Sequence, residues 1–170
     1  MMLRIYLVRH AYAGHADAAK WPDDSARPLT EDAIRKFRSA AAGLRRLVPD
    51  VEVVLSSGFA RAWATAELLH EVARWPSPRD CPALEAGKPA SGALAVLREL
   101  KEQSVALSGH EPYFSTLASL LCAGSEHGLR FQLKKGGVAA VEVDGEIAPG
   151  SGRLLWAVTP KILRRLDESS

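Results

Sequence analysis

Short apolar runs alternate with longer stretches of helical periodicity along this chain. Runs of five or six mostly apolar residues, typical of buried strands, occur at residues 3–8, 51–55, 104–108, 138–143 and 154–158. A short edge strand is predicted at residues 81–84, because Pro82 has no N–H to donate in a central ladder. The last two runs flank a glycine-rich turn, so we expect them to pair in antiparallel fashion.

Apolar residues at helical spacing occupy the intervals between these runs. The clearest helix follows Thr30, an expected N-cap, and extends towards Pro49, with acidic residues in its first turn. Further helices are predicted at residues 59–73, 90–100 and 114–121, the last with Pro112 at its first helical position, and the chain ends in an amphipathic tail. This order predicts an α/β fold: a three-layer α/β/α sandwich with a mostly parallel central sheet, in one domain over residues 1–170.

Charge and cysteine content narrow the class of protein. The 170-residue chain has 22 Lys and Arg against 20 Asp and Glu, and a net charge of +2 does not suggest nucleic acid or a membrane as the main partner. Cys81 and Cys122 are far apart and in no CxxC motif, which indicates free thiols in a reducing compartment. No apolar run is long enough for a signal peptide or a membrane span, so we expect a cytoplasmic protein.

Polar side chains suited to phosphate follow three of the apolar runs. Arg9 and His10 follow the first run, and His110 follows the third. Ser57 follows the second, with Arg61 in the first turn of the next helix. The carboxyl ends of parallel strands meet at one edge of the sheet, where ligands bind in open α/β folds. We therefore expect two arginines, two histidines and a helix N-terminus to converge on one oxyanion.

One member of this set and one further residue have an alternative interpretation. The hydroxyl group of Ser57 suits phosphate binding or capping of the following helix equally well. Arg27, in the long loop before the first helix, can reach the same edge or lie on the surface. Motifs for other chemistry are missing: the sequence contains no GxxxxGK[ST], GxGxxG, HExxH or CxxC. No metal and no cofactor is therefore expected.

Four segments, in this order, resemble the motifs of one enzyme family. They are Arg9-His10-Ala11, Arg27-Pro28-Leu29-Thr30, residues 56–62 with Thr65 and Ala66, and Ser108-Gly109-His110-Glu111-Pro112. Together they make the chain similar to the histidine phosphatase superfamily, also called the phosphoglycerate mutase-like fold. The short length and the His-Glu-Pro segment resemble the bacterial phosphohistidine phosphatase branch in particular.

The resemblance implies a role for each matching residue. His10 is the expected nucleophile, which forms a phosphohistidine intermediate that water then hydrolyses. Arg9 and Arg61 are expected to hold the phosphoryl oxygens, with Arg27 as a further phosphate contact. His110 is expected to complete the pocket and stabilise the transition state. Positive donors suit phosphoryl transfer because its transition state spreads charge over three equatorial oxygens.

Two features depart from the family pattern. Ala11 stands where the family has glycine, which fits if the backbone φ there is negative. Larger family members use a loop carboxylate as general acid; here the candidates are Glu85, Glu111 or none. The P–N bond of phosphohistidine is labile, so a site without a strong acid favours this substrate over phosphate monoesters.

The sequence thus predicts a metal-independent phosphatase that acts through a covalent phosphohistidine on a phosphohistidine-containing protein. A broad phosphatase for small phosphorylated molecules has the same predicted site and is the first alternative. A non-catalytic phosphate-binding signalling module on the same fold is the alternative from another class.

Overall fold

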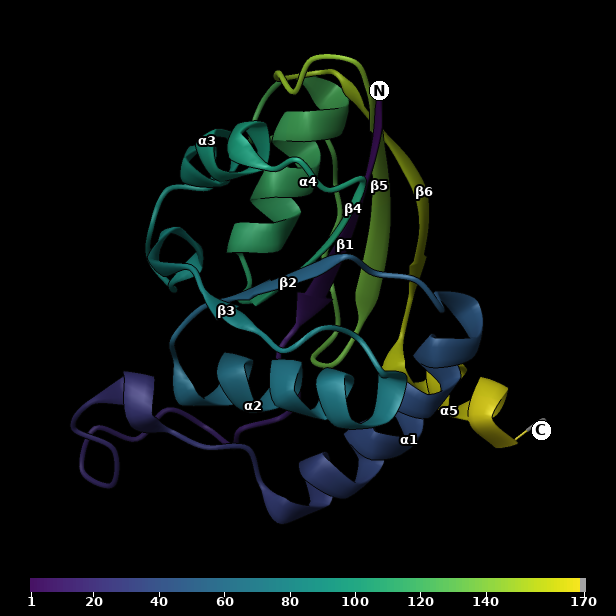
Figure 1. Ribbon diagram of the computed structural model, residues 1–170. Coiled ribbons are helices and arrows are strands. Elements are labelled where there is room, and N and C mark those ends of the chain that lie inside the picture. The colour runs from purple at the N-terminus through teal and green to yellow at the C-terminus, as the bar shows by residue number, and fades with distance from the viewer. Residues whose placement is uncertain (169–170) are drawn as a thin grey trace.

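A six-stranded mixed sheet forms the centre of the molecule in the computed structural model, which describes residues 1–168 (Figure 1). The strand order is β3-β2-β4-β1-β5-β6. The strands are β1 (Met2–Arg9), β2 (Val53–Ser56), β3 (Arg79–Asp80), β4 (Ser104–Gly109), β5 (Val138–Asp144) and β6 (Gly152–Val158). β1 to β4 are mutually parallel, whereas β5 and β6 run antiparallel to their neighbours, so the predicted mostly parallel sheet is confirmed.

Helices cover both faces of this sheet and complete the predicted three layers. They are α1 (Glu31–Leu47), α2 (Ala60–Leu68), α3 (Ser91–Glu99), α4 (Tyr113–Ala123) and α5 (Pro160–Glu168). α1, α2 and α5 lie on one face, and α3 and α4 lie on the other (Figure 1). α1 and α5 approach closely at Gly43, where an added Cβ would lie 1.8 Å from Leu163 O, so only glycine fits there.

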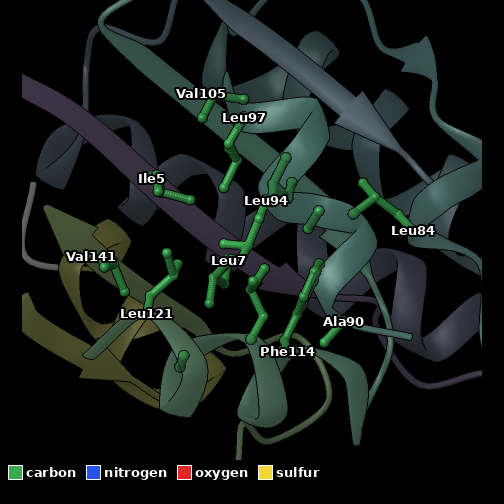
Figure 2. Packing of buried hydrophobic residues seen from close by; sticks show 14 of the residues in the cluster. Ile5, Leu7, Leu84, Ala90, Leu94, Leu97, Val105, Phe114, Leu121 and Val141 are labelled. Carbon is green, nitrogen blue, oxygen red and sulfur yellow. The ribbon is translucent and has the colours of Figure 1, made fainter. Parts of the chain in front are cut away.

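The alternation of side chains along β1 divides the core into two clusters. Ile5 and Leu7 belong to the cluster under α3 and α4, whereas Tyr6 and Val8 belong to the cluster under α1 and α2. Figure 2 shows the first cluster, where Ile5 and Leu7 lie among side chains of α3 and α4 such as Phe114. Burial on both faces explains why the central strands are continuous apolar runs in the sequence.

Two predicted elements differ from those observed. The prediction of an edge strand at residues 81–84 is wrong: the edge strand β3 is Arg79–Asp80, and Pro82–Leu84 forms a 3-10 turn with Pro82 at its start. Proline lacks the N–H of a ladder, and its fixed φ suits the first turn of a helix. The helix predicted at residues 59–73 is α2 followed by a π-helix at Leu69–Ala73, which ends at Arg74 in the left-handed conformation.

Two smaller expectations are resolved by the structure as well. Pro112 is the N-cap of α4 rather than its first helical residue. Cys81 and Cys122 are free thiols, as expected. Within the described part of the chain, no helix has the length and apolar content needed to cross a membrane.

Candidate active site

The carboxyl ends of β1 and β4 bring the two predicted catalytic histidines to neighbouring positions. These parallel strands are paired as far as Arg9 and Gly109, and the His10 N–H donates to Gly109 O at 2.9 Å just beyond β1. His110 is the first residue after β4. The strand ladder therefore fixes both histidines where the two strands leave the sheet.

The ring of His10 is buried, with 6% of the residue exposed, and its orientation is set by the backbone. Its Nδ1–H donates to Ala11 O at 2.6 Å, so the proton of the neutral ring is on Nδ1 and Nε2 keeps its lone pair. The pKa of His10 is lowered to about 4, mainly by burial and also by the nearby arginine charges, against the opposing effect of the Ala11 hydrogen bond. The imidazole is therefore neutral at pH 7.

Ala11 fits its position without backbone strain. Arg74 is the one non-glycine residue with positive φ among residues 1–168, so Ala11 has the negative φ that alanine requires. The Ala11 N–H donates to Thr65 Oγ1 at 3.1 Å, and the Thr65 hydroxyl donates to Arg61 O at 2.8 Å. These bonds attach the backbone next to His10 to the first turns of α2.

The second histidine, His110, faces the ring of His10. The two ring centroids are 5.4 Å apart, with an angle of 59° between the planes. His110 Nε2 and Ser57 Oγ share a hydrogen bond of 2.8 Å, and the ring of Phe59 packs edge-on at 5.0 Å. Burial lowers the pKa of His110 to about 3, with the charge of His10 as the next contribution, so this ring is neutral as well.

One carboxylate orients two of the arginines. Asp24 accepts from Arg61 Nη2 at 3.0 Å and from Arg27 Nε at 2.9 Å. Its backbone oxygen accepts from Arg61 Nη1 at 2.9 Å. Arg27 Nη1 also donates to the carbonyl groups of Ala13 and Gly14. The Arg27 hydrogen bond is the main reason that the pKa of Asp24 is lowered, so the carboxylate remains charged.

The third arginine, Arg9, is held by the loop before β5. Its Nη1 donates to Leu133 O at 2.7 Å, in the loop before β5. Burial lowers the pKa of Arg9, while the charge of Glu111 raises it. Four polar side-chain atoms of the site are buried without a hydrogen-bond partner: Arg9 Nε, Arg61 Nε, His110 Nδ1 and Glu111 Oε2. Such atoms are rare in folded proteins, and the gathering of the arginine N–H donors among them fits a site for an oxyanion.

These side chains surround a cavity of about 250 Å³. It is lined by Arg9, His10, Gly14, His15, Ala16, Arg27, Arg61, Ala86, His110, Glu111 and Lys135. Ser57 and Glu85 are the two predicted site residues outside this lining. Ser57 is fully buried and bonded to His110, whereas Glu85 lies 3.9 Å from the ammonium of Lys88. The neighbour of Glu85, Ala86, is the residue of that loop in the lining.

Glu111 is the carboxylate in the cavity lining. Its Oε1 accepts the Ser115 N–H at 2.7 Å, while Oε2 is buried and has no partner. Burial raises the pKa of Glu111, against the lowering effects of the Ser115 bonds, of the Arg9 charge and of the Leu133 backbone N–H. A carboxyl group with one fixed oxygen and one free oxygen can give up or accept a proton at the free one.

Comparison with known proteins agrees with this geometry. A sequence profile of the histidine phosphatase superfamily (branch 1) matches residues 5–86. An uncharacterized protein of Picosynechococcus is 30% identical over 139 residues, covering 80% of this chain and 82% of that protein. The chain belongs to the histidine phosphatase superfamily.

Two similar proteins belong to one group within this superfamily. The phosphohistidine phosphatase SixA of Escherichia coli is 29% identical over 163 residues, covering 93% of this chain and 94% of that protein. A structure of the protein histidine phosphatase SixA complexed with tungstate superposes with a TM-score of 0.80 at 28% identity, covering 95% of this chain and 99% of the other. The structure thus has the phosphoglycerate mutase-like fold that was predicted.

Sequence reasoning missed two residues of this histidine phosphatase site. Asp24 gives a weak signal, an acidic residue three positions before Arg27 in a loop without periodicity. Lys135 is in the loop before β5, and its only signal is its position just before a strand that pairs with β1. Within residues 1–168, no three His, Cys, Asp or Glu side chains come together as metal ligands.

Proposed function

We propose that this chain is a phosphatase that removes the phosphoryl group from phosphohistidine on a protein, through a covalent intermediate at His10. The observation that carries this proposal is the state of His10: a neutral ring, its proton fixed on Nδ1, in a cavity that it shares with three arginines. The kinship with a bacterial phosphohistidine phosphatase supports the choice of substrate.

In the first step, His10 Nε2 attacks phosphorus and the P–N bond of the substrate breaks. The arginine donors neutralise the charge that spreads over the equatorial oxygens of the transferring group. The planar guanidinium of Arg9 or Arg61 can contact two oxygens at once. The departing imidazole nitrogen takes a proton, and the buried carboxyl group of Glu111 can supply it.

In the second step, water attacks the phosphorus of phospho-His10. The Glu111 carboxylate, having lost its proton, accepts one from the attacking water, and the P–N bond to His10 breaks. Inorganic phosphate leaves, and both His10 and Glu111 return to their starting protonation states.

His110 stabilises the phosphoryl group in both steps. The Ser57 hydroxyl accepts the Phe59 N–H at 3.2 Å and shares a hydrogen bond with His110 Nε2, in which we assign the hydroxyl as the donor. This bond keeps the proton of the neutral His110 ring on Nδ1, where it is free to bind a phosphoryl oxygen. Ser57 acts in this scheme as a positioning residue for His110, not as a direct contact of the substrate.

A phosphatase for small phosphate monoesters is the second candidate, because it needs the same nucleophile and arginines. The two functions differ in how strongly the leaving group needs a general acid. Alkoxide leaving groups need a well-placed proton donor, and the cavity offers one carboxyl group, Glu111, with Glu85 outside the lining. We expect higher kcat/KM on a phosphohistidine protein than on phenyl phosphate, whose basic leaving group needs a proton; equal or better efficiency on this ester favours the second candidate.

Trapping the intermediate tests catalysis itself. We expect ³²P from a labelled phosphohistidine protein to appear on the wild-type chain after rapid quenching, in base-stable and acid-labile form. His10→Ala should remove both the label and the turnover, while His127→Ala, at an exposed loop position, should keep both. Phosphate binding without labelling or turnover in the wild type would instead identify a non-catalytic module.

Activity that survives EDTA is expected, since the arginines supply the positive charge.

A further inference from the structure

Lys135 lies beside Arg9 and His10 at the carboxyl end of β1, although it is distant from them in sequence. β5 pairs antiparallel with β1 up to Val8 and Val138, so the start of β5 meets the carboxyl end of β1. The Gly136 N–H donates to Arg9 O at 3.1 Å and to His10 O at 3.0 Å. The peptide next to Lys135 is thus bonded directly to the backbone of the nucleophile.

The Lys135 side chain has no anionic partner in the structure. Its ammonium lies 4.8 Å from the centroid of the Tyr12 ring, and across residues 1–168 it makes no hydrogen bond or ion pair. Arg27 and Arg61, by contrast, both contact the Asp24 carboxylate. The three donors of the lysine are therefore all available to a ligand in the cavity that it lines.

The electrostatic surroundings of Lys135 indicate what that ligand is. Burial lowers the pKa of Lys135, and the positive charges of Arg9, Arg27 and Arg61 lower it further. Four cationic side chains share a cavity of about 250 Å³ with one carboxyl group and three histidines, of which His10 and His110 are neutral. Like charges at close range repel, and a bound dianion removes this repulsion.

We propose that Lys135 is a fourth cationic contact for the phosphoryl group, supplied by the loop before β5. This inference rests on the proposed function, since it assigns a ligand to the same cavity. The flexible lysine stem can carry its ammonium from the face of Tyr12 to a phosphoryl oxygen, as a point charge that complements the fixed planes of the arginines. Lys135 would then contribute to binding of the free oxyanion as well as to substrate affinity.

Binding of inorganic phosphate and of tungstate, measured by titration calorimetry, tests this assignment without requiring turnover. Removing a charge-assisted hydrogen bond of this kind weakens affinity roughly tenfold to a hundredfold. We therefore expect Lys135→Met to raise the Kd for both anions by about that factor, and Lys135→Arg to restore part of the affinity.

Lys134→Met is the matched control, because Lys134 is the adjacent lysine, is exposed and lies outside the cavity lining. It removes the same charge and should leave both Kd values unchanged. Thermal unfolding of each variant separates a binding effect from a folding defect. Should Lys135→Met not fold, Lys135→Gln provides the same comparison.

Two results overturn the assignment. One is a Lys135→Met protein that is folded and binds both anions as tightly as the wild type; the other is an equal loss in Lys134→Met, which would indicate a general charge effect. If the wild-type chain turns over phosphohistidine while either result holds, the inference about Lys135 fails and the proposed function stands. If the wild type neither binds the anions nor forms a phosphoenzyme, the proposed function itself fails.

Discussion

The imidazole rings of His10 and His110 lie 5.4 Å apart, centroid to centroid, although they follow strands that are separated by most of the chain. The two rings are close because of the order of strands in the sheet. β1 and β4 are adjacent and parallel, with Arg9 and Gly109 in register, so the next residue of each strand is at the same edge. A phosphoryl group attacked by one ring is therefore within reach of the other.

The hydrogen bond between Ser57 and His110 should be visible in the kinetics. Ser57→Ala removes the partner of Nε2 and frees the ring to change its tautomer and orientation, so we expect kcat to fall roughly tenfold with little change in KM. Ser56→Ala is the control, since its equally buried hydroxyl donates to Ser57 O and not to a histidine. Equal kcat values for both variants would contradict a positioning role for Ser57.

The protonation of His10 provides a second prediction. Its pKa is lowered to about 4, so the ring gains a proton only as the pH falls towards that value and stays neutral through pH 5.5–8. In NMR titrations of the free protein with labelled histidine, the His10 signal, assigned by its loss in His10→Ala, should not shift across this range. A midpoint near the ordinary value of about 6.5 would show that burial and the arginines do not keep the nucleophile neutral.

The convergence of the site could be predicted from sequence because it depends on strand ends. Apolar runs buried on both faces are easily recognised, and parallel pairing then brings the residues after each run together. The N-cap at Thr30 was equally visible, and its hydroxyl accepts the Ala33 N–H as expected. These features are local in sequence, so the pattern of single residues is sufficient to find them.

Loop residues were not predictable in the same way. Asp24 and Lys135 occupy segments without periodicity, and only long-range contacts show that one orients two arginines while the other lines the cavity. Glu85 is in the expected loop, but its neighbour Ala86, just before the turn at Gly87, is the residue that lines the cavity. Side-chain direction in a turn depends on backbone angles that residue types alone do not determine.

Substitution of Asp24 can distinguish the orientation of the two arginines from their affinity for phosphate. Asp24→Asn removes a negative charge next to Arg27 and Arg61, which favours anion binding, but weakens the bonds that fix their guanidinium planes. We therefore expect kcat to fall about tenfold while the Kd for inorganic phosphate does not rise. Asp23→Asn is the control, because its carboxylate contacts Ser25 and no arginine. A weaker phosphate affinity with unchanged kcat would contradict this role.

The role of Glu111 can be tested with leaving groups of different basicity. Glu111→Gln retains an oxygen for the Ser115 N–H but has no proton to donate at the free position. General acids contribute roughly 10²–10⁴-fold to catalysis when the leaving group is basic. We therefore expect this variant to lose most activity on phenyl phosphate and much less on p-nitrophenyl phosphate, whose leaving group departs without help.

Glu85→Gln serves as the control for this comparison, since Glu85 is paired with Lys88 and lies outside the cavity lining. It should keep wild-type rates on both esters. A loss in Glu111→Gln that is the same for both esters would assign Glu111 to binding or folding rather than proton transfer. A loss confined to Glu85→Gln, and steeper for phenyl phosphate, would move the acid to the loop before α3 and require that loop to close over the substrate.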